Sequence, residues 1–152
     1  INNLAGGVTV TIEDDFSKVD KTMKLGETIK LTDEQAVHFV HDRYYVGDET
    51  NVQRMKRQEQ YKEGLKKNLG EKCSEDNKYP LTIYDALGDY MVTDINSQKF
   101  SKLALLVLKD KDAGTVSIDG TESVDDLGFV EVQPDEESLQ KAILTLFYKE
   151  YK

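Results

Sequence analysis

Apolar and polar residues alternate over Val8–Ile12, directly after a pair of glycines. A period of two is typical of a half-buried strand, and the glycines indicate a turn before it. A polar connection over residues 13–26 separates this strand from a short extended segment predicted over Glu27–Leu31. Two further strands are predicted over Thr115–Ile118 and Phe129–Val132, with a loop rich in Gly, Asp and Ser between them.

The longer segments carry apolar residues at the spacing of an α-helix. Thr32 and Gln35 form a capping-box pattern, so the first helix is predicted to begin after Thr32. If this helix continues far enough, Arg43 lies at the C-terminal end of its buried face, where the helix dipole favours a cation. The residues expected on that face are Ala36, Val37, Phe39 and Val40.

A second helix is predicted from about Val52 to Leu69, with Gly70 as its C-terminal signal. Its inner stripe is apolar in the C-terminal half and changes to Arg and Gln in the N-terminal half. That change of chemistry along one face is unusual for a helix that only packs. The stripe consists of Arg54, Gln58, Tyr61, Leu65 and Leu69.

The rest of the chain is predicted to be mainly helical. Helices are expected over residues 81–92 and 97–109, the latter capped by Asn96. The last helix follows Pro134, carries acids at 135–137 and is expected to face inward at Leu139, Ala142, Ile143, Leu146 and Phe147. Helix outweighs strand, which predicts an α/β or α+β fold.

One short segment holds every arginine of the chain: Arg43, Arg54 and Arg57. Arginine is preferred over lysine where a phosphate or carboxylate is bound in bidentate fashion. The segment is therefore a candidate anion site, with Gln58 beside it. The alternative is that the arginines form solvent-exposed ion pairs with the carboxylates of Asp42, Asp48 or Glu59.

Composition limits the classes of function. The chain has 152 residues, enough for one domain with a single core. Its formal net charge of −9 disfavours nonspecific binding to nucleic acid, because the field of the whole protein repels polyanions. No apolar run reaches the length of a membrane span. The chain opens at Ile1 without an initiator Met, and we expect it to be a fragment of something longer.

Other candidate chemistry is weaker. His38 and His41 are spaced i, i+3, but no further His or Cys joins them as a metal ligand. Gly47–Asn51 lacks the acidic alternation of an EF-hand loop. Cys73 is the only cysteine, which excludes an intramolecular disulfide, and it has no histidine partner in sequence reach. We therefore predict no metal-ligating residue in this chain.

Several motifs follow one another along the chain: Gly6–Val10, Leu25–Ala36, Phe39–Arg43, Val46–Asp48, Arg54–Gln58, Asp89–Asp94 and Pro134–Glu137. In this order and spacing the chain resembles the LytR-CpsA-Psr family, over nearly its whole length. The resemblance covers only the C-terminal half of the family's catalytic domain. It implies that residues 1–152 are the C-terminal part of a single domain, in which a mixed central sheet is flanked by helices in three α-β-α layers.

The resemblance implies an extracytoplasmic, membrane-anchored enzyme of mainly Gram-positive bacteria. Such an enzyme transfers undecaprenyl-diphosphate-linked glycopolymers, of the teichoic acid or capsule type, onto peptidoglycan. The family binds Mg²⁺ through two aspartates and the substrate diphosphate, and these aspartates are expected in the half that precedes Ile1. The implied partners are the polyprenyl-diphosphate-linked glycopolymer, the peptidoglycan acceptor and that N-terminal half. Alone, the fragment is expected to be inactive, and either to pair with that half or to self-associate.

The resemblance also implies roles for individual residues. Arg43 resembles the second arginine of the family's Arg-x-Arg signature, and His41 stands at the position of the first. Arg54 and Gln58 resemble a downstream Arg and Gln, and Arg57 neighbours them. These matches imply catalytic roles for Arg43 and Arg54, and diphosphate binding by Arg43, Arg54, Arg57, Gln58 and His41.

Two alternatives stay open. The first is a non-catalytic module of the cell envelope that binds a diphosphate lipid or polyanion. The departure from the signature at His41 supports it. The second is a self-sufficient interaction domain whose arginines form salt bridges.

Overall fold

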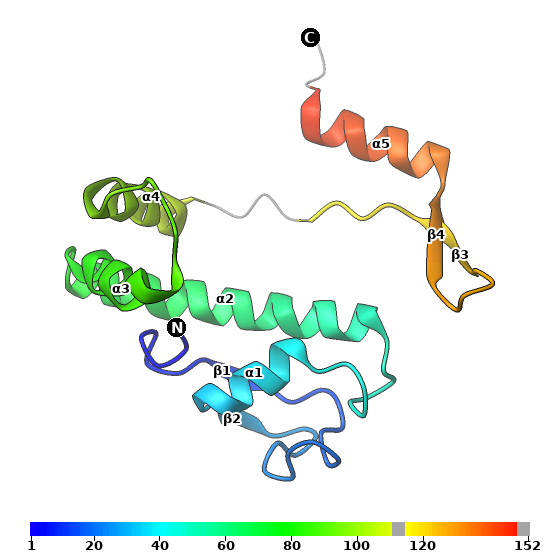
Figure 1. Cartoon of the computed structure of the whole chain (residues 1–152), viewed down its shortest axis with the longest axis horizontal. Helices are drawn as coiled ribbons and strands as arrows, with labels where there is room; N and C mark the ends of the chain where they lie inside the picture. The colour runs from blue at the N-terminus through cyan, green and yellow to red at the C-terminus, as the bar shows by residue number, and fades with distance from the viewer. Residues whose placement is uncertain (111–114, 149–152) are drawn as a thin grey trace. The chain divides into compact units, whose positions relative to one another are not determined.

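The computed structural model describes residues 1–110 and 115–148, and it divides into two compact units, Ile1–Asp110 and Lys111–Lys152. The predicted mixture of helices and strands is confirmed (Figure 1). In chain order the described elements are β1 (Thr9–Thr11), β2 (Thr28–Lys30), α1 (Asp33–His41), α2 (Asn51–Glu75), α3 (Tyr79–Leu87), the 3₁₀ helix η1 (Gly88–Tyr90), α4 (Ser97–Lys109), β3 (Gly120–Val124), β4 (Val130–Pro134) and α5 (Glu136–Phe147).

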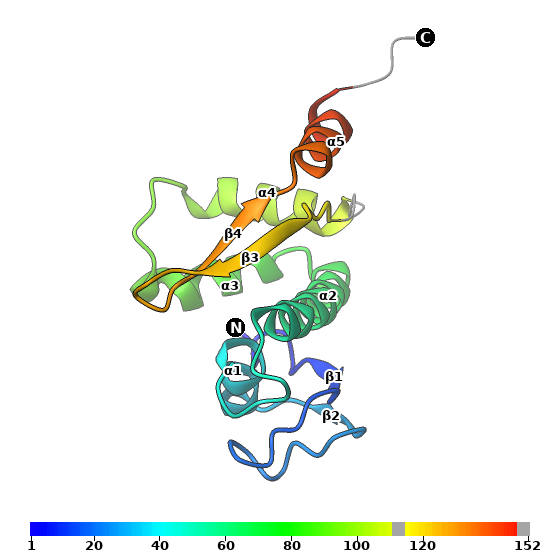
Figure 2. The same cartoon turned by 90° about the vertical axis from the view of Figure 1, so that its right-hand side faces the viewer.

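The strands form two separate two-stranded antiparallel sheets within the described residues, β1–β2 and β3–β4. The α+β class therefore holds, while the sheet of this chain is not one central layer. In the first unit, Val10 pairs with Ile29 in the β1–β2 register. The two predicted extended segments at the N-terminal end thus pair with each other. Figures 1 and 2 show α1 and this small sheet along one side of α2, with α4 on the other.

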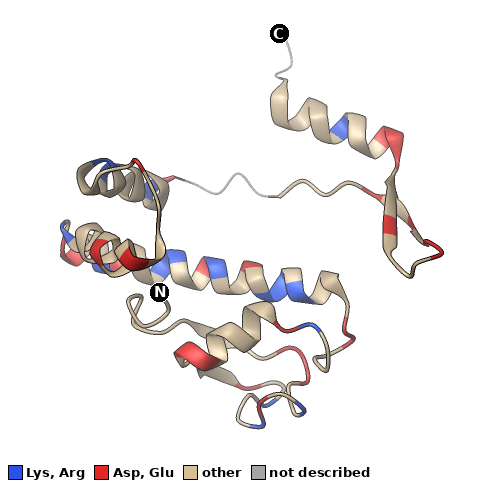
Figure 3. Cartoon of the chain, in the orientation of Figure 1, with Lys and Arg blue, Asp and Glu red and all other residues tan. Residues whose placement is uncertain are grey.

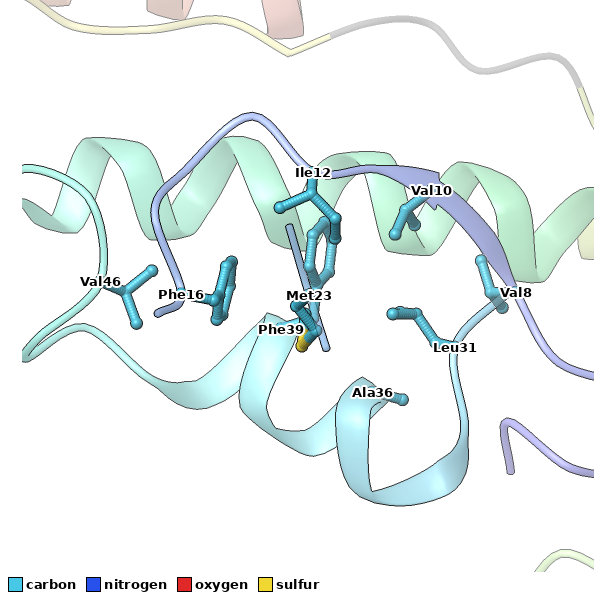
Figure 4. Close-up of a cluster of buried hydrophobic side chains, with 9 residues drawn as sticks. All are labelled: Val8, Val10, Ile12, Phe16, Met23, Leu31, Ala36, Phe39 and Val46. Carbon is cyan, nitrogen blue, oxygen red and sulfur yellow. The ribbon is translucent and has the colours of Figure 1, made fainter. Parts of the chain in front are cut away.

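The core of the first unit lies between β1, α1 and α2 (Figure 4). The rings of Phe16 and Phe39 stack at its centre, with their centroids 6.0 Å apart. Tyr61 and Leu65 of α2 pack against the cluster from outside. The buried residues of the cluster are Val8, Val10, Ile12, Phe16, Met23, Leu31, Ala36, Phe39 and Val46.

Helix α1 begins where the sequence predicts. Gln35 N donates to Thr32 Oγ1 over 3.2 Å, and Thr32 N donates to Gln35 Oε1 over 3.0 Å, which completes the capping box. The helix ends at His41, so Arg43 lies beyond it and not on its last turn. Val37 is 59% exposed, and its predicted inward position is wrong. At 100° per residue it lies to one side of the face that Ala36 and Phe39 define.

Helix α2 differs from the prediction in both length and rotation. It starts after the cap Thr50 and runs through Gly70 to Glu75. Burial of Cys73, beyond the glycine, stabilises this extra turn against the cost of about 1 kcal/mol for a helical glycine. Its buried polar residue is Arg57, whereas Gln58 is exposed. In the N-terminal half of α2 the inward position is thus one residue away from the predicted one, whereas Tyr61 and Leu65 pack against the core as predicted.

Two glycines of α2 provide a matched pair for a stability test. A Cβ on Gly64 would lie 2.5 Å from Val8 Cγ1, while a Cβ on Gly70 would meet nothing within 4 Å. We expect Gly64→Ala to lower the free energy of unfolding by about 1–2 kcal/mol, because crowding against fully buried Val8 outweighs the gain in helix propensity. Gly70→Ala should raise it by up to about 1 kcal/mol. Urea denaturation measures both changes, and equal shifts of the same sign would contradict the close packing of α2 on β1.

Helices α3 and α4 pack against each other in the first unit. The rings of Tyr84 and Phe100 lie 5.3 Å apart, and Tyr84 Oη donates to Ile95 O over 2.9 Å. Helix α4 has the predicted bounds, and Asn96 caps it by accepting from Lys99 N over 2.9 Å. The helix predicted over 81–92 instead starts at Tyr79 and gives way to η1 after Leu87.

The second unit is a hairpin followed by α5. Strand β3 lies in the segment predicted as a loop, while Thr115–Ile118 is not a strand. The turn decides this register: the Asp125 carboxylate accepts from Leu127 N and Phe129 N, so the pairing starts at Val124 and Val130. Helix α5 begins directly after Asp135, the first of the predicted acids, which caps it by accepting from Ser138 N. Ala142 is buried, but Ile143, Leu146 and Phe147 are exposed, contrary to the expectation that they face inward.

Candidate functional site

The end of α1 is bound by two side chains from the start of α2. Arg57 Nε donates to Phe39 O over 2.9 Å, and Gln58 Nε2 donates to Val40 O over 2.9 Å. Arg57 Nη2 donates to Asp42 O. The last carbonyls of a helix have no partner within the helix, so these side chains supply the missing donors. They also fix the point at which the following loop, residues 43–50, leaves α1.

Arg57 forms a buried ion pair as well. Its Nη1 donates to the carboxylate of Asp14, and both side chains are almost completely buried, with 5% and 4% exposure. The guanidinium carbon also lies 5.4 Å from the centroid of the Phe16 ring. Arg57 thus joins three segments that are distant in sequence. Because its donors bond to protein oxygens, Arg57 has a structural role.

The loop over residues 43–50 packs against the carboxylate of Asp14 at Gly47. A Cβ on Gly47 would lie 3.0 Å from Asp14 Oδ1, and Gly47 has a φ of +54°, so this position suits glycine. Tyr45 and Glu49 also have positive φ, 65° and 62°. Tyr45 N donates to Glu49 Oε1 over 3.1 Å. Non-glycine residues in this region carry strain of about 1–3 kcal/mol each, which often accompanies a functional loop.

A hollow of about 350 Å³ opens beside this loop, lined by His41, Asp42, Arg43, Tyr44 and Arg54. The guanidinium carbon of Arg43 lies 4.5 Å from the centroid of the Tyr44 ring, and Arg43 Nη2 donates to Tyr44 Oη. The hollow thus collects two of the arginines predicted from sequence, Arg43 and Arg54, together with His41. Arg57 and Gln58, the other predicted site residues, bind the end of α1 instead.

Within the described residues, neither arginine of the hollow has a carboxylate partner. In residues 1–110 and 115–148, no ion pair involves Arg43 or Arg54. Arg54 Nη2 donates to Asn51 Oδ1 over 2.7 Å, while its Nε is buried and has no acceptor in the described part of the chain. A buried donor without an acceptor costs about 1–3 kcal/mol. The hollow is therefore cationic and short of acceptors, despite the acidic chain around it.

The carboxylates that could have neutralised these arginines have other partners. Glu59 pairs with Lys62 over 2.7 Å. Asp48 accepts from the hydroxyl and amide of Thr50, and these hydrogen bonds hold the pKa of Asp48 below its usual range. Asp42 lies between the two histidines. Lys and Arg recur along α2, as Figure 3 shows, and of these residues Arg54 lines the hollow.

Asp42 bridges both histidines of the chain. Its Oδ2 lies 2.7 Å from His38 Nδ1, and its Oδ1 lies 3.3 Å from His41 Nδ1. His38 is partly buried, whereas the side chain of His41 is 81% exposed. In the described part of the chain, no group of three or more His, Cys, Asp or Glu side chains is arranged to hold a metal ion.

Cys73 has no features of a nucleophile. It is buried, and burial raises the pKa of its thiol, with a smaller contribution from Asp76 in the same direction. A thiol that remains protonated at neutral pH reacts slowly. Cys73 therefore belongs to the packing of α2, as its position in the extra turn indicates.

Asp14 was not among the predicted site residues, although the sequence contains a signal for its inward position. The residues Val8, Val10, Ile12 and Phe16 are all buried and alternate with more exposed neighbours. Asp14 falls on the same face of this period-two pattern, so it points inward with them. An acid on a buried face needs a cationic partner, which Arg57 supplies.

Comparisons with known proteins agree with the motifs. The family model described as the LytR_cpsA_psr family matches residues 1–146. No curated protein matches the chain. No helix among the described residues is both long and apolar enough to cross a membrane. The chain belongs to the LytR-CpsA-Psr family, and this membership implies a part in the transfer of glycopolymers in the cell envelope.

Proposed function

We propose that this chain is the C-terminal part of a phosphotransferase that moves polyprenyl-diphosphate-linked anionic glycopolymers, of the teichoic acid or capsule type, onto peptidoglycan. The observation that carries the proposal is the hollow that contains Arg43 and Arg54, for which the described residues provide no carboxylate partner. A diphosphate would supply acceptors to both guanidiniums, and arginine binds phosphate oxygens in bidentate fashion.

The chemistry needs such cations. When the bond between the two phosphoryl groups breaks, negative charge develops on the departing polyprenyl phosphate. Fixed guanidiniums stabilise that charge more in the transition state than in the ground state, which lowers the barrier. Arg43 lies in the loop after α1 and Arg54 on the first turns of α2. The donors of Arg57 and Gln58 fix the end of α1 relative to the start of α2, and with it the spacing of the two cations.

The proposal includes parts that this chain does not provide. Mg²⁺ would polarise the phosphoryl group, and we place its ligands in the N-terminal half of the domain, as the family resemblance implies. We also place the intact protein outside the cytoplasm, anchored to the membrane, where its lipid-linked substrate and peptidoglycan are found. The isolated chain is accordingly expected to be inactive, and to pair with its other half or with itself.

Ligand binding tests the hollow directly. We expect geranylgeranyl diphosphate to raise the melting temperature of the intact protein. At a concentration one hundred times its Kd, the ligand should add about 2.7 kcal/mol to the free energy of unfolding. Geranylgeraniol should raise the melting temperature much less. Arg43→Ala and Arg54→Ala should reduce the diphosphate-dependent shift, because each removes a donor to the anion. Lys56→Ala, a loss of one exposed cation on the same helix, is the control. Equal shifts with the alcohol and the diphosphate would refute an anion site.

A second candidate is a non-catalytic module that binds the same lipid without transferring it. The presence of His41 where the family signature has an arginine favours it, since a neutral imidazole adds no charge to the hollow. Binding without release of polyprenyl phosphate would support this candidate. The interaction-domain alternative is weaker, because only Arg57 of the three arginines forms an ion pair within the described residues.

A further inference from the structure

We propose that His41 is the general base of the transfer reaction, taking the proton of the acceptor hydroxyl on Nε2 while Asp42 orients its ring. This inference rests on the function proposed above. It assigns a role in the reaction to His41, which stands at a position where the family signature has an arginine.

Asp42 determines which nitrogen of His41 is free. A carboxylate can only accept hydrogen bonds, so the position of Asp42 Oδ1, 3.3 Å from His41 Nδ1, favours the tautomer that carries its proton on Nδ1. In the neutral ring, Nε2 then carries the lone pair. The same carboxylate stabilises the imidazolium that forms once Nε2 takes a proton, as in hydrolases that use an acid–histidine pair. The contact is long, as such contacts often are before substrate binds.

The carboxylate is itself fixed in place. Asp42 Oδ2 lies 2.7 Å from His38 Nδ1, and the backbone carbonyl of Asp42 accepts from Arg57. One oxygen is thus engaged by a partly buried histidine and the other is directed at the exposed one. The two histidines therefore differ in role: His38 anchors the carboxylate, and only His41 lines the hollow.

His41 shares the hollow with the residues proposed to bind the diphosphate. The charged and titratable groups around it are Asp42, Arg43 and Tyr44 from the end of α1 and the loop, Arg54 from α2, and His38 through the shared carboxylate. The 81% exposure of its side chain suits a base whose proton donor is a bulky polymer hydroxyl arriving from outside. An arginine at this position could bind the diphosphate but could not accept a proton.

The proposed step transfers the phosphoryl group that carries the glycopolymer to the acceptor hydroxyl. The acceptor oxygen forms a bond to the phosphorus that carries the glycopolymer, and the bond from that phosphorus to the bridging oxygen breaks. The electron pair leaves with the polyprenyl phosphate, facing Arg43 and Arg54. The proton of the acceptor hydroxyl passes to His41 Nε2 and then to solvent. The products are a glycopolymer phosphodiester on the acceptor and polyprenyl monophosphate.

The test measures release of polyprenyl monophosphate by the intact protein from a synthetic polyprenyl-diphosphate-linked saccharide. A soluble peptidoglycan fragment serves as acceptor, between pH 5.5 and 8.5. For the native protein we expect kcat/KM to rise with pH, because a general base acts only in its unprotonated form. His41→Gln should lower kcat by about 10²- to 10⁴-fold, remove this rise with pH and leave KM nearly unchanged. Lys67→Gln, at an exposed position of α2, should leave the rate and profile unchanged.

His41→Arg separates a base from a cation. If His41 is the base, this variant binds the diphosphate substrate at least as well as the native protein but is as slow as His41→Gln. If His41→Arg keeps the native rate, or if the pH profile survives in His41→Gln, the base assignment is wrong while the proposed function stands. If the native protein binds the diphosphate but releases no product at any pH, the transferase function fails, and this inference with it. Because His41 is exposed, melting temperatures of the variants should match the native value, which verifies that they fold.

Discussion

Replacing Arg57 by methionine is expected to lower the free energy of unfolding by about 3–5 kcal/mol. The substitution leaves Asp14 buried without its cation, and a buried unpaired carboxylate is among the most costly defects in a protein. It also removes the donors to Phe39 O and Asp42 O. Urea denaturation of the intact protein measures the loss. A shift below about 1 kcal/mol would show that the pair is solvated and that α1 does not depend on it.

Two further variants identify the cause. Asp14→Leu combined with Arg57→Met removes both charges, so most of the lost stability should return, although the carbonyls at the end of α1 still lack donors. Arg43→Met removes a cation of the hollow that forms no ion pair within the described residues. It should change the free energy of unfolding by no more than about 0.5 kcal/mol. A double variant as unstable as Arg57→Met alone would assign the loss to the carbonyls and not to the ion pair.

Arg43→Ala and Arg54→Ala are each expected to reduce the rate of glycopolymer transfer by 10²-fold or more, an order-of-magnitude estimate for one donor to a developing charge. The assay is release of polyprenyl monophosphate by the intact protein at saturating substrate. The effect should lie in kcat, because the charge that these cations meet is largest in the transition state. Arg54→Lys should recover part of the loss, since lysine restores the charge but not the planar pair of donors.

The control for this prediction is Lys56→Ala, which removes an exposed cation two residues from Arg54 on the same helix. Its rate should stay within a few-fold of the native one, because a surface charge acts only through screened long-range attraction. Rates that fall equally for Lys56→Ala and Arg54→Ala would mean that net charge, and not the hollow, governs activity. Unchanged rates for both arginine variants would remove them from the catalytic site.

Local signals accounted for what the sequence predicted well. The capping box at Thr32, the cap Asn96 and the acids after Pro134 each fix a helix start through contacts a few residues apart. The helical bounds over 97–109 were correct for the same reason. Helix ends were less well predicted, because Gly70 and the region after Leu87 depend on packing against distant segments.

The candidate site was predicted in part. Grouping Arg43, Arg54 and His41 relied on their closeness in sequence, and the structure brings these three into one hollow. The inward residue predicted for the N-terminal half of α2, Gln58, was wrong because the first ten residues of the helix offer few apolar side chains to set the phase, and Val52 and Met55 are 59% and 57% exposed. The phase is set instead by Asp14, more than forty residues away, which binds Arg57. A contact between residues so far apart in sequence does not appear in the pattern of apolar and polar residues along α2.

The guanidinium of Arg57 bonds to the segment after β1, to the last turn of α1 and to the residue after it, while its own backbone belongs to α2. Segments joined through one buried group do not open independently. Exchange of backbone amides with solvent should therefore proceed as one cooperative event across the end of α1 and the start of α2, with an opening free energy near that of the whole core. We therefore expect the end of α1 and the start of α2, which carry His41 and Arg54, to keep their spacing before any ligand arrives.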